Sequence, residues 1–412
     1  MSSIITIHTS LLFCPERQRF LSDISLTVDP STGLITSVFG RTELLDHLLP
    51  GDIDLRGKTV LPGLVDAHTH IFLHPYSETP ALNQMRDESL VERVIRATNH
   101  CRAALLAGYT TYRDLGTESL QDADVNVRDA INRGLMPGPR LFVATEALTS
   151  SGGYDIRQEN RLGGTSLPRI ADIADGVDGV RAAVRRRIGA GADVVKFYAD
   201  YRKRQLRFPP EQFPGQPAIQ FPPDEDRNPD LLLFNQQEMD AIVEEAKAAN
   251  CPVAAHACSS AGVIMAAKAG VTSVEHGFEP SDEALQTMKE YNTIFVPTLA
   301  ACELFMPMGQ ILAQTRKAWK MGIKLACGGD TGAFAHGDNV RELMLTAATL
   351  HGWDACGGQW CGRRFGCFES GVAADVIALD GDLRMDSGAL RQVSFVMKDG
   401  RVWKEHGKAI TT

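Results

Sequence analysis

The sequence has no long apolar stretch and no block of basic residues, and we expect no secretion signal in its first residues. Its apolar runs fall well short of the about 20 residues that a helix needs to cross a bilayer, so we expect no membrane-spanning segment. The formal net charge is -9 and basic residues form no cluster, so we expect no nucleic-acid partner. Residues 1–20 alternate apolar and polar side chains, whereas a signal peptide joins a basic segment to an apolar core.

Cysteine is scarce and odd in number. Nine cysteines among 412 residues leave one over from any full pairing, which is typical of reduced thiols and not of a disulfide framework. We therefore expect a cytoplasmic protein. Cys356 and Cys361 form a C-x4-C spacing, with Cys367 beyond it, but this is a weak metal signal and ordinary thiols are the favoured interpretation.

Two kinds of periodicity divide the chain. A hydrophobic content of 44% allows a large core. From Ile4 to about Lys58, and again in Ala374–Leu379 and Ser394–Trp403, short alternating strands are broken by turn residues, including the hairpin signal Asp399-Gly400. We predict that the two ends pair into a small β-sandwich composed of residues 1–58 and 370–412.

Residues 59–369 alternate between strand and helix patterns, which is typical of parallel βαβ units. Eight short runs rich in Val, Ile and Thr predict strands. The predicted strands are Thr59–Val65, Thr110–Arg113, Leu141–Thr145, Val194–Tyr198, Val253–His256, Thr272–His276, Thr293–Pro297 and Lys324–Cys327.

Helical patterns separate most of these runs, and several end at Gly or Asn. Eight alternating units over about 300 residues suit a (β/α)8 TIM-like barrel. A doubly wound open sheet is the alternative, although no Gly-rich fingerprint follows any of the strands. The predicted helices are Glu88–Ala107, Val177–Ala190, Gln236–Ala248, Ser259–Ala269, Ser281–Tyr291 and Gln310–Met321.

Histidine, aspartate and lysine side chains mark the ends of several predicted strands. His68 and His70 are two residues apart on an extended backbone, so they project from one face and can present two imidazoles to one metal. An isolated His-x-His is more often structural, but further residues strengthen the signal. These are His256 and His276 at the ends of the fifth and sixth strands, Asp330 after the eighth, and Lys196 within the fourth.

In a parallel barrel the carboxyl ends of all strands converge on one rim, so these six side chains would meet there. Lys196 lies in an apolar run, and a buried lysine is costly unless it is neutralised or paired. Imidazole and carboxylate together suit zinc, and manganese, iron or cobalt are alternatives. The pattern therefore predicts a metal centre.

Four ordered motifs resemble those of the amidohydrolase superfamily, and the resemblance covers nearly the whole chain. It is strongest to the imidazolonepropionase-like branch, which contains Xaa-Pro dipeptidases and ochratoxin-hydrolysing amidohydrolases. The resemblance implies a hydrolase that cleaves an amide bond, peptide-like or of an N-acyl amino acid. The motifs are Val60–His70, Gly108–Asp114, Val274–Gly277 and Gly371–Val376.

The resemblance also implies a binuclear centre with two divalent metal ions, zinc first. Two metals would lower the pKa of a bridging water to give a metal-bridged hydroxide, and one would polarise the scissile carbonyl. Asp330 would take the hydroxide proton and pass it to the departing amine. The ligand roles fall to His68 and His70 at the more buried metal, His256 and His276 at the more exposed one, Lys196 as a carboxylated bridge, and Asp330 beside the buried metal.

Four residues near the rim are candidate substrate contacts: His74, Tyr154, Tyr198 and His336. Tyr154 stands where relatives often carry the histidine of Gly-Gly-His, which puts an imidazole contribution from that loop in doubt. His336 follows the eighth strand and could equally be an exposed loop histidine.

Residues 200–233 form a long Pro-rich insertion with basic and aromatic side chains. It follows the fourth strand and must emerge on the active-site rim, where long loops often act as lids. A solvated surface excursion is the alternative. As a lid, the insertion favours a small-molecule substrate with a carboxylate and a bulky apolar part, such as an N-acyl amino acid or a dipeptide.

Other interpretations stay open. Compared with the family that the chain resembles, we expect about one helix to be missing where Glu342–Leu345 runs into Thr346–Thr349, so an inactive barrel is one alternative. A deaminase or cyclic-amide hydrolase on the same barrel is another, although Lys196 argues against a mononuclear deaminase. A non-catalytic scaffold is a third. Arg113 and Asp114 are expected to form a structural ion pair, and the sequence leaves open whether the protein is a homo-oligomer.

Overall fold

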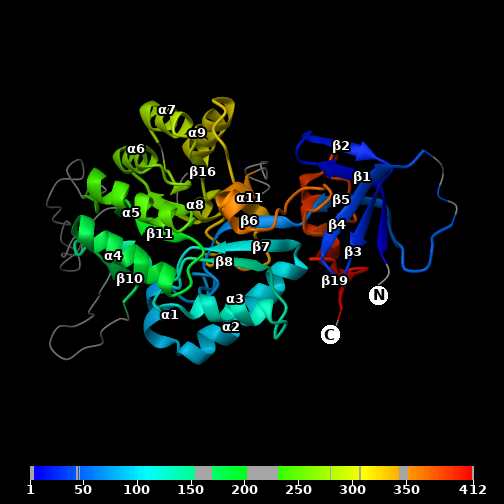
Figure 1. Ribbon diagram of the computed structural model, residues 1–412, viewed down its shortest axis with the longest axis horizontal. Coiled ribbons are helices and arrows are strands. Elements are labelled where there is room, and N and C mark those ends of the chain that lie inside the picture. Colours follow the sequence, from blue (N-terminus) through cyan, green and yellow to red (C-terminus); the bar gives the residue numbers. More distant parts are fainter. Residues whose placement is uncertain are drawn as a thin grey trace, which may run out of the picture.

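Strands from both chain ends lie side by side, apart from most of the helices (Figure 1). The structure is a computed structural model that describes residues 4–42, 45, 47–153, 169–201, 231–278, 280–305, 308–342 and 351–410. Tyr154, residues 202–230 of the insertion and the segment 343–350, where a helix seemed to be missing, lie outside the described residues. No helix of the described part is long and apolar enough to cross a membrane.

A nine-stranded sheet joins the two chain ends. Its order is β20-β19-β18-β17-β5-β1-β3-β4, with β2 paired to β1. The central strand β5 is parallel to β1 and antiparallel to β17, and apolar residues of both ends, among them Ile7, Val60 and Phe395, share one core. The strands are β1 (Ile5–Cys14), β2 (Arg19–Ser22), β3 (Ile24–Asp29), β4 (Leu34–Gly40), β5 (Ile53–Pro62), β17 (Val376–Leu379), β18 (Val393–Lys398), β19 (Arg401–Glu405) and β20 (Lys408–Ala409).

Parallel strands form two further sheets, in the orders β6-β7-β8 and β10-β9-β11-β14-β15-β16. Isolated parallel bridges extend them, from Phe295 of β16 to Leu325 and from Thr331 to Thr69 of β6. The strands are β6 (Leu64–Thr69), β7 (Tyr109–Asp114), β8 (Arg140–Val143), β9 (Ala147–Thr149), β10 (Ala171–Ile173), β11 (Val195–Tyr198), β14 (Val253–Ala257), β15 (Ser273–His276) and β16 (Ile294–Val296); β12 (Asp200–Tyr201) and β13 (Leu231–Leu232) pair separately.

Two predicted strands are wrong in extent. The run Thr59–Val65 is divided at Gly63 between β5 of the large sheet and β6 of the parallel sheet. A Cβ on Gly63 would lie 2.2 Å from the hydroxyl oxygen of Thr110, so the chain can change sheets there only with glycine. The eighth run, Lys324–Cys327, contributes only the bridge at Leu325.

Helices follow most of the parallel strands, and α4 to α7 pack against the six-stranded sheet through one large apolar core. Asn235 and Glu238 form a capping box at the start of α5, and Gly270, with φ of 85°, ends α6 in the left-handed region. The helices are α1 (Ala81–Asp87), α2 (Leu90–Leu106), α3 (Ala123–Asn132), α4 (Gly176–Gly189), α5 (Gln236–Ala248), α6 (Ser260–Ala269), α7 (Asp282–Glu290), α8 (Leu299–Phe305), α9 (Met308–Lys320) and α11 (Gly352–Ala355).

Candidate metal centre

Four histidine rings form a continuous row at the ends of three strands. His68 and His70 come from the end of β6, His256 from β14 and His276 from the last position of β15. Neighbouring ring centroids are 5.4 Å apart for His70 and His68, 4.9 Å for His68 and His276, and 4.6 Å for His276 and His256. All four residues are buried. The structure therefore brings together the histidines that the sequence singled out.

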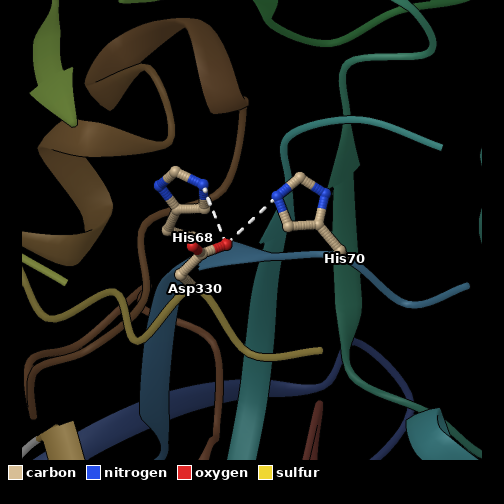
Figure 2. Close-up of side chains that lie close together, drawn as sticks. All are labelled: His68, His70 and Asp330. Atoms are coloured by element: carbon tan, nitrogen blue, oxygen red, sulfur yellow. Dashed lines mark ion pairs between the residues drawn. The ribbon is translucent and has the colours of Figure 1, made fainter. Parts of the chain in front are cut away.

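Asp330 closes one end of this row (Figure 2). Its Oδ1 lies 3.2 Å from Nε2 of His70 and 3.6 Å from Nε2 of His68, so both rings point a nitrogen at one carboxylate oxygen. Burial alone would raise the pKa of Asp330, but His70, His68 and His276 outweigh burial and hold that pKa well below its usual value. The ligand atoms of the three residues lie within 4.8 Å of one another, close enough to hold one metal ion.

Fixed hydrogen bonds orient three of the rings through Nδ1. The Nδ1 of His70 donates to the carbonyl of Gly116 at 2.9 Å, and the Nδ1 of His276 lies 3.0 Å from the hydroxyl of Thr298. The Nδ1 of His68 lies 2.8 Å from Oε2 of Glu275. A bond at Nδ1 sets the ring orientation and leaves the lone pair of Nε2 for a ligand, as in histidines that bind metals.

Lys196 lies in the middle of β11 and is buried. Its Nζ has no hydrogen-bond partner among the described residues. Burial lowers the pKa of Lys196 to about 8, and burial also lowers the pKas of His68 and His276, to which the charge of Lys196 adds. A buried amine without a partner is unusual in a folded protein. Beside four imidazoles and a carboxylate it fits a ligand set for metal ions, with Lys196 contributing as a carbamate.

A second possible ligand group adjoins the row at His256. The Nε2 of His256 lies 3.4 Å from the thiol of Cys258 and 3.9 Å from Oδ1 of Asp200, and these three also satisfy the spacing for a metal ion. Sequence reasoning missed Asp200 and Cys258. Their signals were present, because Asp200 follows the fourth predicted strand and Cys258 stands two residues after His256.

Two residues of the centre hold unusual backbone conformations. His276 has φ of 71° and Asp330 has φ of 58°, in the left-handed region that non-glycine residues rarely adopt. Thr298, the partner of His276, has φ of 49°. Such conformations cost about 1–3 kcal/mol each and concentrate at functional sites, where the surrounding structure imposes them.

The sequence predicted an ion pair between Arg113 and Asp114, but each of the two residues contacts a different partner. Arg113 pairs with Glu275 at 2.7 Å, whereas Oδ1 of Asp114 accepts from the backbone N–H of Ile71 at 2.7 Å. Consecutive residues of a strand face opposite sides, so the two neighbours reach different partners. Sequence reasoning did not assign Glu275 a role, although it lies in the motif Val274–Gly277.

Sequence comparison with known proteins places this chain in a family. The sequence profile of the amidohydrolase family matches residues 59–404, which contain the four histidines, Lys196 and Asp330. The chain belongs to the amidohydrolase family. It is a hydrolase that acts on amide C–N bonds.

Relatives of this amidohydrolase include ochratoxinase of Aspergillus niger, which is 29% identical over 401 residues covering 85% of this chain and 77% of that protein. Imidazolonepropionase of Symbiobacterium thermophilum is 27% identical over 422 residues, with coverages of 91% and 89%. A crystal structure of a Xaa-Pro dipeptidase with bound methionine in the active site is 29% identical, has a TM-score of 0.77, and matches 98% of this chain and 100% of that one. The resemblance drawn from the sequence motifs is confirmed.

The candidate substrate contacts of the amidohydrolase lie in different surroundings. The ring of Tyr198 is 5.3 Å from that of His256. His74 is fully buried, with Nε2 2.6 Å from Glu88, and Nε2 of the buried His336 lies 3.2 Å from the carbonyl oxygen of Leu73. These contacts of His74 and His336 are structural, and the substrate roles of Tyr198, His74 and His336 stay predictions.

Cys356 and Cys361, the two cysteines of the C-x4-C spacing, are free thiols. All nine cysteines are free, and the thiol of Cys361 donates to the carbonyl of Cys356 at 2.8 Å. Burial raises the pKa of Cys361 and of Cys367 to about 12, which keeps both protonated at neutral pH.

Proposed function

We propose that this amidohydrolase is a metal-dependent enzyme that hydrolyses a peptide-like amide or an N-acyl amino acid. The observation that carries the proposal is the meeting of four histidines and a carboxylate beside a buried lysine whose amine has no hydrogen-bond partner in the described part of the chain. Imidazole with carboxylate is the donor set of catalytic zinc. The centre would hold two divalent ions, zinc first, with these ligands: His68, His70, Lys196, His256, His276 and Asp330.

The geometry supports a division of these ligands into two groups. Asp330 contacts His68 and His70 but lies at one end of the row, whereas His256 and His276 are neighbours at the other end. Lys196, whose charge acts on His68 and His276, would connect the two groups. Carboxylation turns its buried cation into an anion with two oxygens, which removes the cost of burying an unpaired charge.

The proposed chemistry assigns the proton transfer to Asp330. Bound at these ligands, divalent metal ions lower the pKa of water and polarise a scissile carbonyl. The carboxylate of Asp330, whose Oδ1 lies beside His68 and His70, would accept a proton from the attacking water. The same carboxyl group would pass the proton to the departing amine nitrogen. Burial of the histidines limits access of bulk water.

We also propose that the parallel strands close into a (β/α)8 barrel over residues 59–369, with a β-sandwich built from residues 1–58 and 370–412. The bridges from Phe295 to Leu325 and from Thr331 to Thr69 support closure, because they connect the outer strands of the two parallel sheets. We keep a cytoplasmic location as a prediction; it is supported by the nine free thiols.

The relatives support a substrate with a free carboxylate. One relative is named for ochratoxin hydrolysis, and the Xaa-Pro dipeptidase structure holds methionine in its active site. An N-acyl amino acid or a dipeptide shares this chemistry, because hydrolysis releases an amino acid. Tyr198, beside His256, is the described aromatic residue that we expect to contact such a substrate.

Elemental analysis coupled to a substrate panel tests the proposal. Protein purified from zinc- or manganese-supplemented medium should contain close to two metal ions per chain and should release amino acids from N-acyl amino acids or dipeptides. Metal at background level would contradict the metal centre. Release of ammonia with no amino acid would favour a deaminase, and opening of cyclic amides with no cleavage of linear ones would favour a cyclic-amide hydrolase.

A further inference from the structure

Glu275 lies fully buried between a histidine of the centre and an arginine. Its Oε2 is 2.8 Å from Nδ1 of His68, and its Oε1 accepts from Arg113 at 2.7 Å and from the hydroxyl of Ser273 at 2.5 Å. The side chains of Glu275 and Arg113 have 0% exposure. Among the described residues, the hydrogen-bond partners of this carboxylate are therefore Arg113, Ser273 and a proposed metal ligand, His68.

The strand pattern explains why Glu275 reaches His68. Ser273 and Glu275 share one face of β15, whereas Val274 faces the other way into the core shared with the helices. Arg113 comes from β7, which belongs to a different sheet from β15. Glu275 thus points inward, where it meets residues from both parallel sheets.

Arg113 is itself fixed in place. Its Nε donates to the carbonyl of Ala67 at 2.6 Å, and one terminal nitrogen donates to the carbonyl of Ala355 at 2.8 Å and to Ser273 at 2.9 Å. The other terminal nitrogen holds Glu275. With its guanidinium held at three sides, Arg113 fixes the position of the Glu275 carboxylate.

The bond at Nδ1 of His68 is of a different kind from those at Nδ1 of His70 and His276. The Nδ1 atoms of His70 and His276 bond to neutral oxygens, of Gly116 and Thr298. A carboxylate acceptor makes a stronger bond and increases the electron density on the opposite ring nitrogen. A buried ion pair adds little stability compared with apolar residues of the same volume, so stability alone does not account for this one.

We propose that Glu275, held by Arg113, is a positioning residue for His68: it keeps the proton on Nδ1, directs Nε2 to the metal and strengthens metal binding there. The inference rests on the proposed metal centre. The position of the proton on the His68 ring can be tested without metal, whereas the effect of Glu275 on metal affinity requires metal.

The tautomer of His68 is the first test. In the metal-free parent protein, nitrogen-15 NMR with the His68 signal assigned should show the proton on Nδ1 and a lone pair on Nε2. A proton on Nε2 alone would overturn the inference. Because this measurement uses the parent chain, it gives a result even if every variant misfolds.

Zinc titration of metal-free protein is the second test. Glu275→Gln keeps the shape and removes the charge, and the double variant Arg113→Met with Glu275→Gln leaves no buried arginine unpaired. Both should bind zinc about 10–100-fold more weakly at the tighter site. The control is Glu146→Gln, which alters a buried carboxylate that pairs with Arg187 and should retain the parent affinity.

Melting of the metal-free proteins separates positioning from folding. A double variant that melts near the parent temperature but binds zinc weakly would support the inference. Parent-like zinc affinity in either folded variant would overturn it. A parent protein that binds no zinc would instead contradict the proposed metal centre. The tautomer of His68 would still test whether Glu275 keeps the proton on Nδ1.

Discussion

Lys196 is a buried lysine of the candidate metal centre. In the sequence it is a cation in an apolar run, and in the structure its amine is buried and has no hydrogen-bond partner among the described residues. A core lysine with no partner would be strongly unfavourable as a permanent feature. The position of Lys196 among the histidines is therefore more informative than any of the histidines alone.

Lys196→Ala should abolish activity and lower the metal content, because the proposed bridge between the two ligand groups is lost. Acetate, propionate or bicarbonate should restore part of the activity by replacing the carbamate. Turnover and metal content measured on the same preparations check this. Lys317→Ala, which removes an exposed lysine paired with Asp282, should match the parent. Full activity in Lys196→Ala would show that the bridge is assigned wrongly.

Asp330→Asn should keep the shape of the side chain but remove the base, since an amide cannot accept the proton at neutral pH. We expect kcat to fall by about 10²–10⁴-fold, the usual size of general acid–base catalysis. Metal content and melting temperature should change much less, because the histidines and Lys196 are intact. A variant that keeps its metal and most of its turnover would assign the base to another residue.

At the residue scale, sequence reasoning found the groups at strand ends and missed those that act across the fold. The four histidines of the row could be predicted from the sequence, because strand periodicity and parallel topology place such residues at one end of the strands. The partner of Arg113 could not be predicted from the sequence, since β7 and β15 are separated by about 160 residues and meet only through tertiary structure. Glu275 looked like an ordinary strand residue for the same reason.

At the scale of elements, amphipathic helices with clear caps were the most predictable. The expected helix Gln236–Ala248 has the same bounds as α5, where Asn235 caps its first turn. The helices α1, α3, α8 and α11 were missed, although α3 carries sequence signals at both ends, Asp122 at its N-cap and Gly134 after its C-cap. Strand boundaries were less predictable, because pairing partners decide them.

Arg140 joins β8 to the large sheet and gives a prediction at this scale. It donates to Asp375 at 3.0 Å and to Asp399 at 2.6 Å, which flank β17 and β18. Arg140→Met should lower the free energy of unfolding by about 3–5 kcal/mol, because it leaves the fully buried carboxylate of Asp375 without its charged partner. Denaturant unfolding checks this. Arg363→Met, which removes a more exposed contact to Asp399, should cost under about 1 kcal/mol.

The effect of Arg140→Met should depend on pH. Burial raises the pKa of Asp399, but the charges of Arg140 and Lys398 outweigh it and lower that pKa below the ordinary value. A lowered carboxyl pKa contributes stability above the unfolded pKa of about 3.9, which is lost as the pH falls through the folded value. The stability gap between parent and variant should therefore be largest above about pH 4 and narrow in acid. A constant gap would contradict this origin.

At the scale of the whole molecule, metal binding should stabilise the fold. The proposed ligands come from β6 and the residue after it, from β11, β14 and β15, and from the segment between the bridges at Leu325 and Thr331, so bound metal would tie distant parts of the chain together. A ligand present at 100 times its Kd stabilises the folded state by about 2.7 kcal/mol. Chelation should lower the melting temperature, and added zinc should restore it. A melting temperature indifferent to chelator would count against a metal centre.

The position of β5 in the large sheet has a consequence for biosynthesis. Strands β1 to β4 can pair with β5 or with one another as soon as they are made, but the other edge of β5 pairs with β17, which begins at Val376. Translation at about 5–20 residues per second separates the two strands by roughly 15–60 s. During that interval Val60 and Leu61 lie on an open strand edge, which can pair with another nascent chain. Production of this protein should therefore depend on chaperones more than its folded stability suggests.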